Sequence, residues 1–246
     1  MRFSLFKRQP DPDLIEVAHA GMLYPVAVKR RAAARRLTLR VSQATGEITL
    51  TLPERVDFAS GRSFAEKHGG WIAARLAKRP AGVPFEPGAL VPLRGTPHRI
   101  VHWTKVRGLT RATRSSEGEP ILAVCGEAAH VARRVKDFLR REALADLEKA
   151  VRIHTAALGI PARKITIRDT TSRWGSCSSK GHLNFSWRLI LAPPLVLDYL
   201  AAHEVAHLKE MNHSHRFWAL THKLCPRTEE AEAWLKRQGA GLHGYG

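Results

Sequence analysis

The stretch Ala202-His203-Glu204-Val205-Ala206-His207-Leu208 is the most specific pattern in the 246-residue chain. In a helix, residues four positions apart point within about 40° of each other and lie about 6 Å apart along the axis. The imidazoles of His203 and His207 can therefore reach one metal ion. Glu204 lies at the edge of the same helical face, where its carboxylate can hold and deprotonate a metal-bound water. The spacing is the HExxH arrangement of zinc-dependent hydrolases.

The residues around this motif favour a buried helix. Pro193 and Pro194 suit a helix start. The helix expected over residues 195–209 is apolar on nearly every side: Leu195, Val196, Leu197, Tyr199, Leu200, Val205 and Leu208. Two histidines and a carboxylate in such a helix are costly without a compensating partner, and a metal ion provides one. We therefore expect a zinc site at His203 and His207, with Glu204 as the catalytic carboxylate.

A third ligand is expected because catalytic zinc sites usually have three protein ligands and an open fourth position. His213 is the leading candidate, at the spacing that metzincins use. This is no ordinary metzincin, because Glu210 stands where that pattern has glycine and no methionine follows Met211. We expect Asn212 to adopt a left-handed conformation that ends the helix and turns His213 back. The alternative ligands are His215 and, as in gluzincins, the acidic residues Glu229, Glu230 and Glu232 of a final helix.

Further helices and strands surround the motif in the C-terminal half. Apolar spacing predicts a helix over residues 128–158, ended by Gly159, and another over residues 228–238. Alternating apolar residues predict strands over residues 164–168 and 182–187.

The N-terminal half is mainly strand-like. Period-2 patterns predict strands near residues 24–28, 37–41 and 48–52, then a helix over residues 58–78, then short strands near residues 90–93, 99–103 and 121–124. The sequence thus predicts an α+β fold in three parts. These are a loose lead-in at residues 1–20, a β-rich N-terminal half with one helix at residues 21–128, and a helix/sheet half with the HExxH helix at residues 129–246. No internal repeat is visible.

The chain is strongly basic, with 40 Lys and Arg against 22 Asp and Glu and a formal net charge of +18. Such a field favours nucleic acid or another polyanion as a partner. Six basic residues fall close together: Lys29, Arg30, Arg31, Arg35, Arg36 and Arg40. The competing explanation is an Arg-rich composition without a ligand, since Arg outnumbers Lys throughout the chain.

Composition indicates a globular protein of a reducing cytoplasm, with no membrane partner. Hydrophobic residues make up 44% and charged residues 25% of the chain, so wholesale disorder is excluded. No apolar run approaches the ~20 residues that span a bilayer, and the N-terminus lacks the apolar core of a secretory signal. The three cysteines, Cys125, Cys177 and Cys225, do not form a disulfide framework.

Several motifs together resemble one known family. The runs Arg173-Trp174-Gly175-Ser176-Cys177, Leu183-Asn184-Phe185, Pro193-Pro194 and residues 203–218 closely resemble the YgjP-like metallopeptidases, which are related to the SprT-like proteases. The Arg-rich residues 30–40, the strands ending at Pro53 and Trp71-Ile72 agree as well, so the resemblance covers residues 26–237. It implies a zincin-like domain that holds Zn²⁺ through His203, His207 and His213 and uses Glu204 as the catalytic carboxylate.

We therefore expect a zinc-dependent metallohydrolase that cleaves amide bonds of a peptide or protein, with Glu204 taking the proton of a zinc-activated water. The resemblance places an edge strand near residues 175–184 over the site, where it would align an extended peptide by strand addition. The candidates for stabilising the oxyanion are Tyr199, His215 and Arg216. One alternative is a nucleotide phosphoanhydride hydrolase, which the charge favours although no Gly-rich phosphate loop is visible. Another is a DNA-associated module with a structural zinc, which would normally need four protein ligands and no Glu204.

Overall fold

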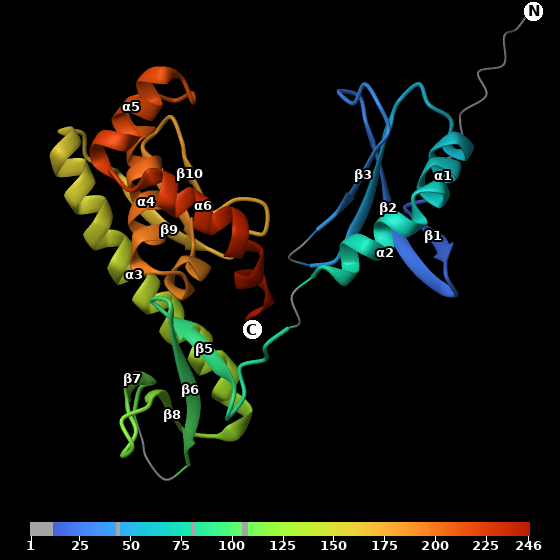
Figure 1. Ribbon diagram of the computed structural model, residues 1–246. Helices are drawn as coiled ribbons and strands as arrows, with labels where there is room; N and C mark the ends of the chain where they lie inside the picture. The colour runs from blue at the N-terminus through green and yellow to red at the C-terminus, as the bar shows by residue number, and fades with distance from the viewer. Residues whose placement is uncertain (1–11, 43–44, 80–81, 105–107) are drawn as a thin grey trace, which may run out of the picture. The chain divides into compact units, whose positions relative to one another are not determined.

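The structure, a computed structural model, describes residues 12–42, 45–79, 82–104 and 108–246. Its contacts divide the chain into two units, Met1–Arg79 and Pro80–Gly246 (Figure 1). The mixed α+β character predicted from the sequence is confirmed, with strands predominant up to Cys125 and helices beyond it.

The first unit is a four-stranded sheet in the order β1-β2-β4-β3. The strands are β1 (Leu14–His19), β2 (Met22–Arg31), β3 (Thr38–Val41) and β4 (Ile48–Pro53). β1 and β3 are antiparallel to their neighbours, whereas β2 and β4 run parallel. The sequence predicts a loose lead-in at residues 1–20, but residues 14–19 instead form β1, because Ile15 and Val17 are buried in the core of this unit. Residues 1–11 of the expected lead-in lie outside the described residues.

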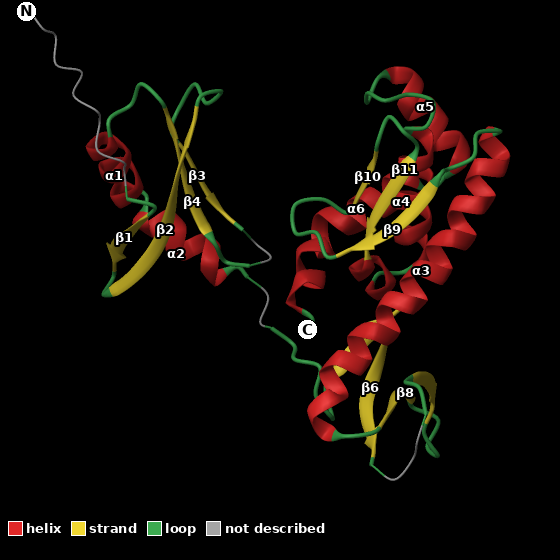
Figure 2. Ribbon diagram, turned by 180° about the vertical axis from the view of Figure 1, so that it is seen from behind, coloured by secondary structure: helices red, strands yellow, loops and turns green. Residues whose placement is uncertain are grey.

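Two helices, α1 (Phe58–Lys67) and α2 (Gly69–Ala77), cover one face of this sheet (Figure 2). The sequence predicts one helix over residues 58–78, but the helix breaks at His68. The break brings Gly69 and Gly70 against β1, where a Cβ on Gly69 would lie 3.0 Å from the Cβ of His19. The two glycines therefore allow the helices to bend around the end of the first hairpin.

The basic cluster predicted to bind a polyanion lies on β2, β3 and the loop between them. Arg30 has a structural role, because its Nη1 donates hydrogen bonds to the carbonyls of Pro53, Glu54 and Val56 at 2.8–3.1 Å. The others are exposed: Lys29, Arg31, Arg35, Arg36 and Arg40. Their contact with a polyanion stays a prediction, and it rests on five residues rather than six.

The second unit begins with a sheet that has the same strand arrangement as the first, in the order β5-β6-β8-β7. Its strands are β5 (Leu90–Leu93), β6 (Thr96–Trp103), β7 (Arg111–Arg114) and β8 (Pro120–Cys125). As in the first unit, an antiparallel hairpin is followed by a parallel pair and an antiparallel edge strand. The fold thus repeats a topology that the residue pattern does not reveal.

The helix α3 (Val131–Leu158) joins this sheet to the rest of the second unit. One buried cluster contains Val135 and Phe138 of α3, Ile100 and Leu122 of the sheet, and the residues around α4. The sequence predicts a boundary between residues 128 and 129, but the contacts place it between Arg79 and Pro80. The reason is that β5–β8 bury their apolar side chains in the same core as α3, and not with β1–β4.

The remainder of the second unit is a three-stranded sheet with helices packed on it (Figure 2). The sheet has the order β10-β11-β9, from β9 (Lys164–Arg168), β10 (Gly175–Cys177) and β11 (His182–Ser186). The helices are α4 (Pro194–Ala206), α5 (His215–Leu224) and α6 (Thr228–Gln238), with short 3-10 turns at residues 128–130, 187–191 and 239–244. No helix in the described part of the chain has the length and apolarity needed to cross a membrane.

Candidate metal centre

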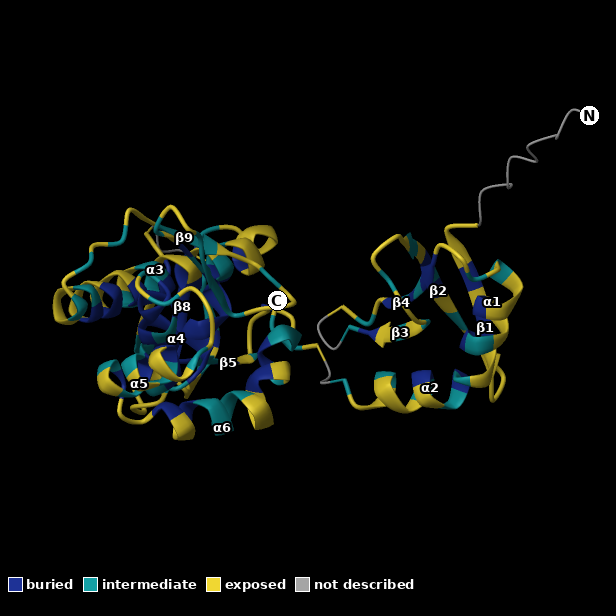
Figure 3. Cartoon of the chain, turned by 90° about the horizontal axis from the view of Figure 1, so that it is seen from above, coloured by how far each residue is buried: buried dark blue, intermediate teal, exposed yellow. Residues whose placement is uncertain are grey.

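The helix α4 carries the first two candidate ligands through the core of the second unit. Pro194 occupies its first turn, and most of its residues are buried (Figure 3). The helix ends at Ala206, three residues before the predicted end at residue 209, and His207 follows as its C-cap. His203 and His207 are still on one continuous turn, because the amide of His207 donates to the carbonyl of His203 at 3.3 Å.

A tight turn follows His207 at the end of α4. The amides of Lys209 and Glu210 both donate to the carbonyl of Ala206, at 3.1 and 3.0 Å. The expectation that Asn212 is left-handed is wrong, because Ala20 and Arg94 are the non-glycine residues with positive φ among those described. The position of His213 is fixed from the other side by Ser214, whose hydroxyl accepts a hydrogen bond from the amide of Phe217 and caps α5.

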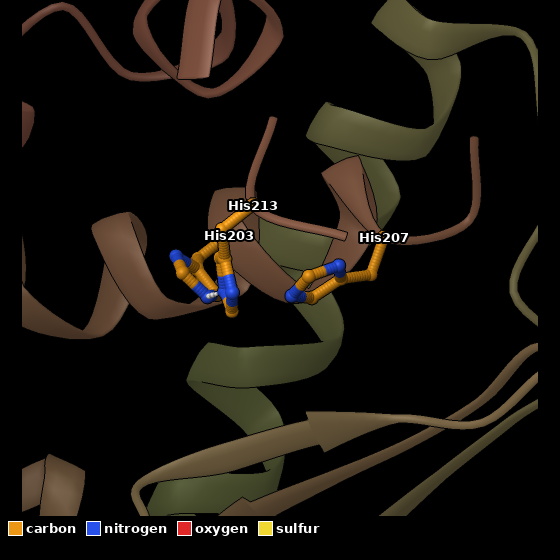
Figure 4. Close-up of side chains that lie close together, drawn as sticks. All are labelled: His203, His207 and His213. Carbon is orange, nitrogen blue, oxygen red and sulfur yellow. Dashed lines mark hydrogen bonds between the residues drawn. The ribbon is translucent and has the colours of Figure 1, made fainter. Parts of the chain in front are cut away.

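The structure brings His203, His207 and His213 together (Figure 4). One ring nitrogen from each lies within 4.8 Å of those of the other two. The Nε2 atoms of His203 and His213 are 3.2 Å apart. Two nitrogens at about 2.0–2.1 Å from a tetrahedral zinc ion lie about 3.3 Å apart, so this separation suits a shared metal.

The protonation of His207 also suits metal binding. Its Nδ1 lies 3.0 Å from the carbonyl oxygen of Glu210. A carbonyl only accepts, so Nδ1 carries the hydrogen and Nε2 keeps its lone pair. Burial lowers the pKa of His207 below its ordinary value and that of His203 to about 4. Both imidazoles are therefore neutral at pH 7, the form that binds metal ions.

Glu204, the residue that follows His203 on α4, has one oxygen unsatisfied. The residue is 4% exposed, and its Oε2 is buried without a hydrogen-bond partner among the described residues. Burial raises the pKa of Glu204 to about 8, although Arg173 acts in the opposite direction. A buried carboxylate without a partner is unfavourable unless a cation or a hydrogen-bond donor completes its surroundings.

These observations fit a divalent metal ion. Three imidazoles supply borderline nitrogen ligands, which zinc favours, and three is the number that a catalytic site provides. A cation among them would stabilise the neighbouring carboxylate of Glu204, and a water on that cation could donate to the unsatisfied Oε2. The described residues therefore provide both a donor set and a reason for Glu204 to be buried beside it.

The strand β10 closes the other side of Glu204. An added Cβ on Gly175 would overlap the carboxylate of Glu204 and lie 2.8 Å from its Cδ. A side chain at position 175 would therefore have to displace the carboxylate from its place beside β10. Cys177, two residues on, is no candidate nucleophile, because burial and the nearby Glu204 raise its pKa to about 11.

Replacing Gly175 by Ala is therefore expected to displace Glu204 while leaving the histidines in place. Hydrolysis should fall by about 10–100-fold, because a displacement near 1 Å at a reacting group costs up to about 10²-fold. Zinc content should not change. The matched control is Gly241→Ala, since a Cβ there meets nothing within 4 Å. Equal rates for Gly175→Ala and the control would show that β10 does not fix the carboxylate.

The three acidic residues of α6 that were alternative ligands each contact another side chain. Glu229 pairs with His222 at 3.5 Å, and Glu230 pairs with Arg227 at 2.7 Å. Glu232 accepts a hydrogen bond from the hydroxyl of Tyr199 at 2.9 Å. Tyr199 is one of the candidates for stabilising an oxyanion. Because its hydroxyl proton is donated to Glu232, that proton is not available to an oxyanion. His215 and Arg216, the other two, are exposed in the first turn of α5.

Phe217 is a site residue that the sequence reasoning missed. It is fully buried, and its ring stacks on His207 with centroids 4.4 Å apart. The same ring lies edge-on to His203 and His213, at 4.9 and 4.8 Å. Its position four residues after His213 is the available signal, because the start of α5 turns this side chain toward α4. Phe217 thus limits the rotation of all three imidazoles.

A cavity of about 350 Å³ opens beside His207. Leu208 and Met211 form part of its apolar lining, and residues 178–181, which follow β10, form another wall together with Arg163. The cavity and the edge strand β10 thus lie next to the triad, at a place where a substrate side chain could be bound.

One comparison with known proteins, with a family model, agrees with these features. The sequence model of the family described as YgjP-like, metallopeptidase domain, matches residues 35–238. A search of curated proteins finds no significant match. Among solved structures, the metallopeptidase zymogen abylysin of Pyrococcus abyssi matches 37% of this chain and 93% of its own, with 23% identity and a TM-score of 0.34. That structural similarity is too low to carry an argument about the site.

Proposed function

The chain belongs to the YgjP-like metallopeptidase family, and from that premise we propose that it is a zinc-dependent peptidase whose active site is formed by His203, His207, His213 and Glu204. The observation that carries the proposal is the convergence of three imidazole nitrogens within 4.8 Å of one another, beside a buried carboxylate. The DNA-associated module with a structural zinc is less well supported, because such a site normally has four protein ligands. The described residues bring three together.

The three histidines would hold the metal through their ring nitrogens. Zinc bound there lowers the pKa of a water molecule and polarises a carbonyl oxygen. The hydrogen bond from His207 to Glu210 and the packing of Phe217 against all three imidazoles keep the rings oriented for this purpose. Preoriented ligands increase metal affinity, because less freedom is lost on binding.

Glu204 would act as the general base and then as the general acid. Its carboxylate accepts a proton from the attacking water and returns it to the amine that leaves. Its burial and its contact with β10 hold the carboxylate in one place. Burial raises the pKa of Glu204 and Arg173 only partly opposes this, so a cation held by the histidines would be what keeps the carboxylate ionised as a base.

The edge strand β10 would align the substrate. It lies at the end of the β10-β11-β9 sheet and pairs only with β11 among the described strands. An extended peptide can add to such an edge through backbone hydrogen bonds, which recognise a main chain rather than a particular side chain. A peptide in this position would pass Glu204, and the cavity beside His207 could receive one of its side chains.

A substrate screen tests this proposal against the nucleotide alternative. The purified protein, with one equivalent of zinc, is incubated with a mixture of unstructured peptides and separately with nucleoside triphosphates, and the products are identified by mass spectrometry. The proposal requires new peptide termini that a chelator abolishes. Nucleotide hydrolysis without peptide cleavage would overturn it in favour of the phosphoanhydride hydrolase.

A further inference from the structure

A chain of hydrogen bonds connects the helix α6 to one of the candidate ligands. The hydroxyl of Tyr199 lies 2.9 Å from Oε1 of Glu232 and 3.4 Å from Nδ1 of His203. Tyr199 is 4% exposed, and its ring lies edge-on to that of His203 with centroids 5.8 Å apart. The three side chains therefore form a connected set: Glu232 on α6, then Tyr199 and His203 one turn apart on α4.

The direction of these hydrogen bonds follows from the chemistry of the groups. A carboxylate only accepts, so the hydroxyl proton of Tyr199 points to Glu232. The hydroxyl oxygen then has lone pairs for His203, and Nδ1 of His203 is the donor. With its hydrogen on Nδ1, the imidazole keeps a lone pair on Nε2, which is the atom 3.2 Å from Nε2 of His213.

We propose that Glu232 is a positioning residue for the metal site, which acts through Tyr199 to fix the tautomer and the ring orientation of His203. Glu232 was a candidate for direct ligation and Tyr199 for oxyanion stabilisation, and their mutual hydrogen bond gives both a different role. His207 receives the same kind of support from the backbone carbonyl of Glu210. The support of His203 comes from side chains instead, so mutation can remove it.

The position of Glu232 suits this role. Its second oxygen lies 3.5 Å from Nζ of Lys236, one turn further along α6, and its side chain is 29% exposed. The contact with Lys236 holds the carboxylate at the helix surface, with its other oxygen turned to Tyr199. Since α6 also packs against α4, the carboxylate can reach Tyr199 without leaving the helix surface.

Zinc affinity of the metal-free protein tests the proposal, and it rests on the proposed zinc site but not on peptide cleavage. Affinity is measured by competition with a chelator for the wild type, Tyr199→Phe, Glu232→Ala and Glu232→Gln.

Residues that orient a metal-binding histidine usually contribute 10–100-fold in affinity. We expect a loss of about that size in Tyr199→Phe and Glu232→Ala. The loss in Glu232→Gln should be smaller, because the amide oxygen can still accept the hydroxyl proton. Glu229→Gln, on the same helix, is the control and should bind as the wild type does.

A double variant distinguishes a connected chain from two separate structural effects. If Glu232 acts through Tyr199, the Tyr199→Phe/Glu232→Ala protein should lose no more affinity than the weaker-binding single variant. Additive losses, or wild-type affinity in Glu232→Ala, would overturn the proposal. Thermal unfolding of the metal-free variants checks that each one folds. If Tyr199→Phe does not fold, the zinc affinity of Glu232→Ala by itself still tests the proposal. If the wild type binds no zinc, the proposed zinc site itself is wrong. The measurement on the wild type shows this separately from any effect of the variants.

Discussion

Replacing Glu204 by Gln is expected to abolish measurable peptide hydrolysis while leaving the fold and the zinc content unchanged. An amide cannot accept the proton of the attacking water, and general acid–base catalysis typically contributes 10²–10⁴-fold to a rate. Gln has nearly the same shape as Glu, so the tight contact with Gly175 is preserved. The expected change is therefore in the rate alone, which is measured under saturating zinc with a peptide from the substrate screen.

The control for this experiment is Glu230→Gln, which removes an exposed carboxylate that pairs with Arg227 on the surface. Its rate should equal that of the wild type. Loss of zinc from Glu204→Gln would mean that the carboxylate helps to hold the metal. Full activity with zinc retained would exclude Glu204 as the base.

Replacing His213 by Ala is expected to weaken zinc binding more than any change in the surrounding residues. The substitution removes one of three ligands, whereas residues that only orient a ligand contribute 10–100-fold. We therefore expect a loss in affinity well beyond 100-fold and no zinc in the protein after dialysis, as measured by elemental analysis.

His215→Ala is the matched control, because this exposed histidine lies two residues further on and outside the cluster of ligand nitrogens. It should retain zinc. If zinc survives in His213→Ala and is lost from Glu229→Ala or Glu230→Ala instead, the third ligand lies on α6 and the gluzincin alternative is right.

Much of the second unit could be predicted because its helices have strong local patterns. The predicted bounds of α6, residues 228–238, agree with the structure, and Gly159 ends α3 in the left-handed conformation that glycine favours. The helix α5 was not predicted, although Ser214 is a good N-cap and Phe217, Leu220 and Leu224 have helical spacing. Its many polar and aromatic residues obscured that spacing.

The domain boundary could not be predicted because it depends on packing between distant parts of the chain. The strands predicted near residues 90–93, 99–103 and 121–124 are short and apolar like those before them, so the sequence alone places both sheets in one N-terminal half. Only the burial of residues such as Ile100 and Leu122 against α3 shows that the second sheet belongs with the C-terminal helices. Period-2 alternation reveals that a face is buried but not which element covers it.

The candidate site was likewise predictable only in part. Helical spacing alone predicts that His203, Glu204 and His207 lie near one another, because all three are on a single turn of α4 or directly after it. The tight contact of Gly175 with Glu204 and the hydrogen bond between Tyr199 and Glu232 arise between elements that are distant in sequence. No local pattern encodes them.

A zinc titration of the metal-depleted protein, with peptide cleavage as the readout, tests the proposed metal centre directly. We expect no cleavage without metal and a rate that rises linearly with added zinc until one equivalent per chain is present, because one triad of histidines would hold one ion. Cleavage that persists in the metal-depleted protein, or a rate that does not respond to zinc, would contradict the proposed metal centre.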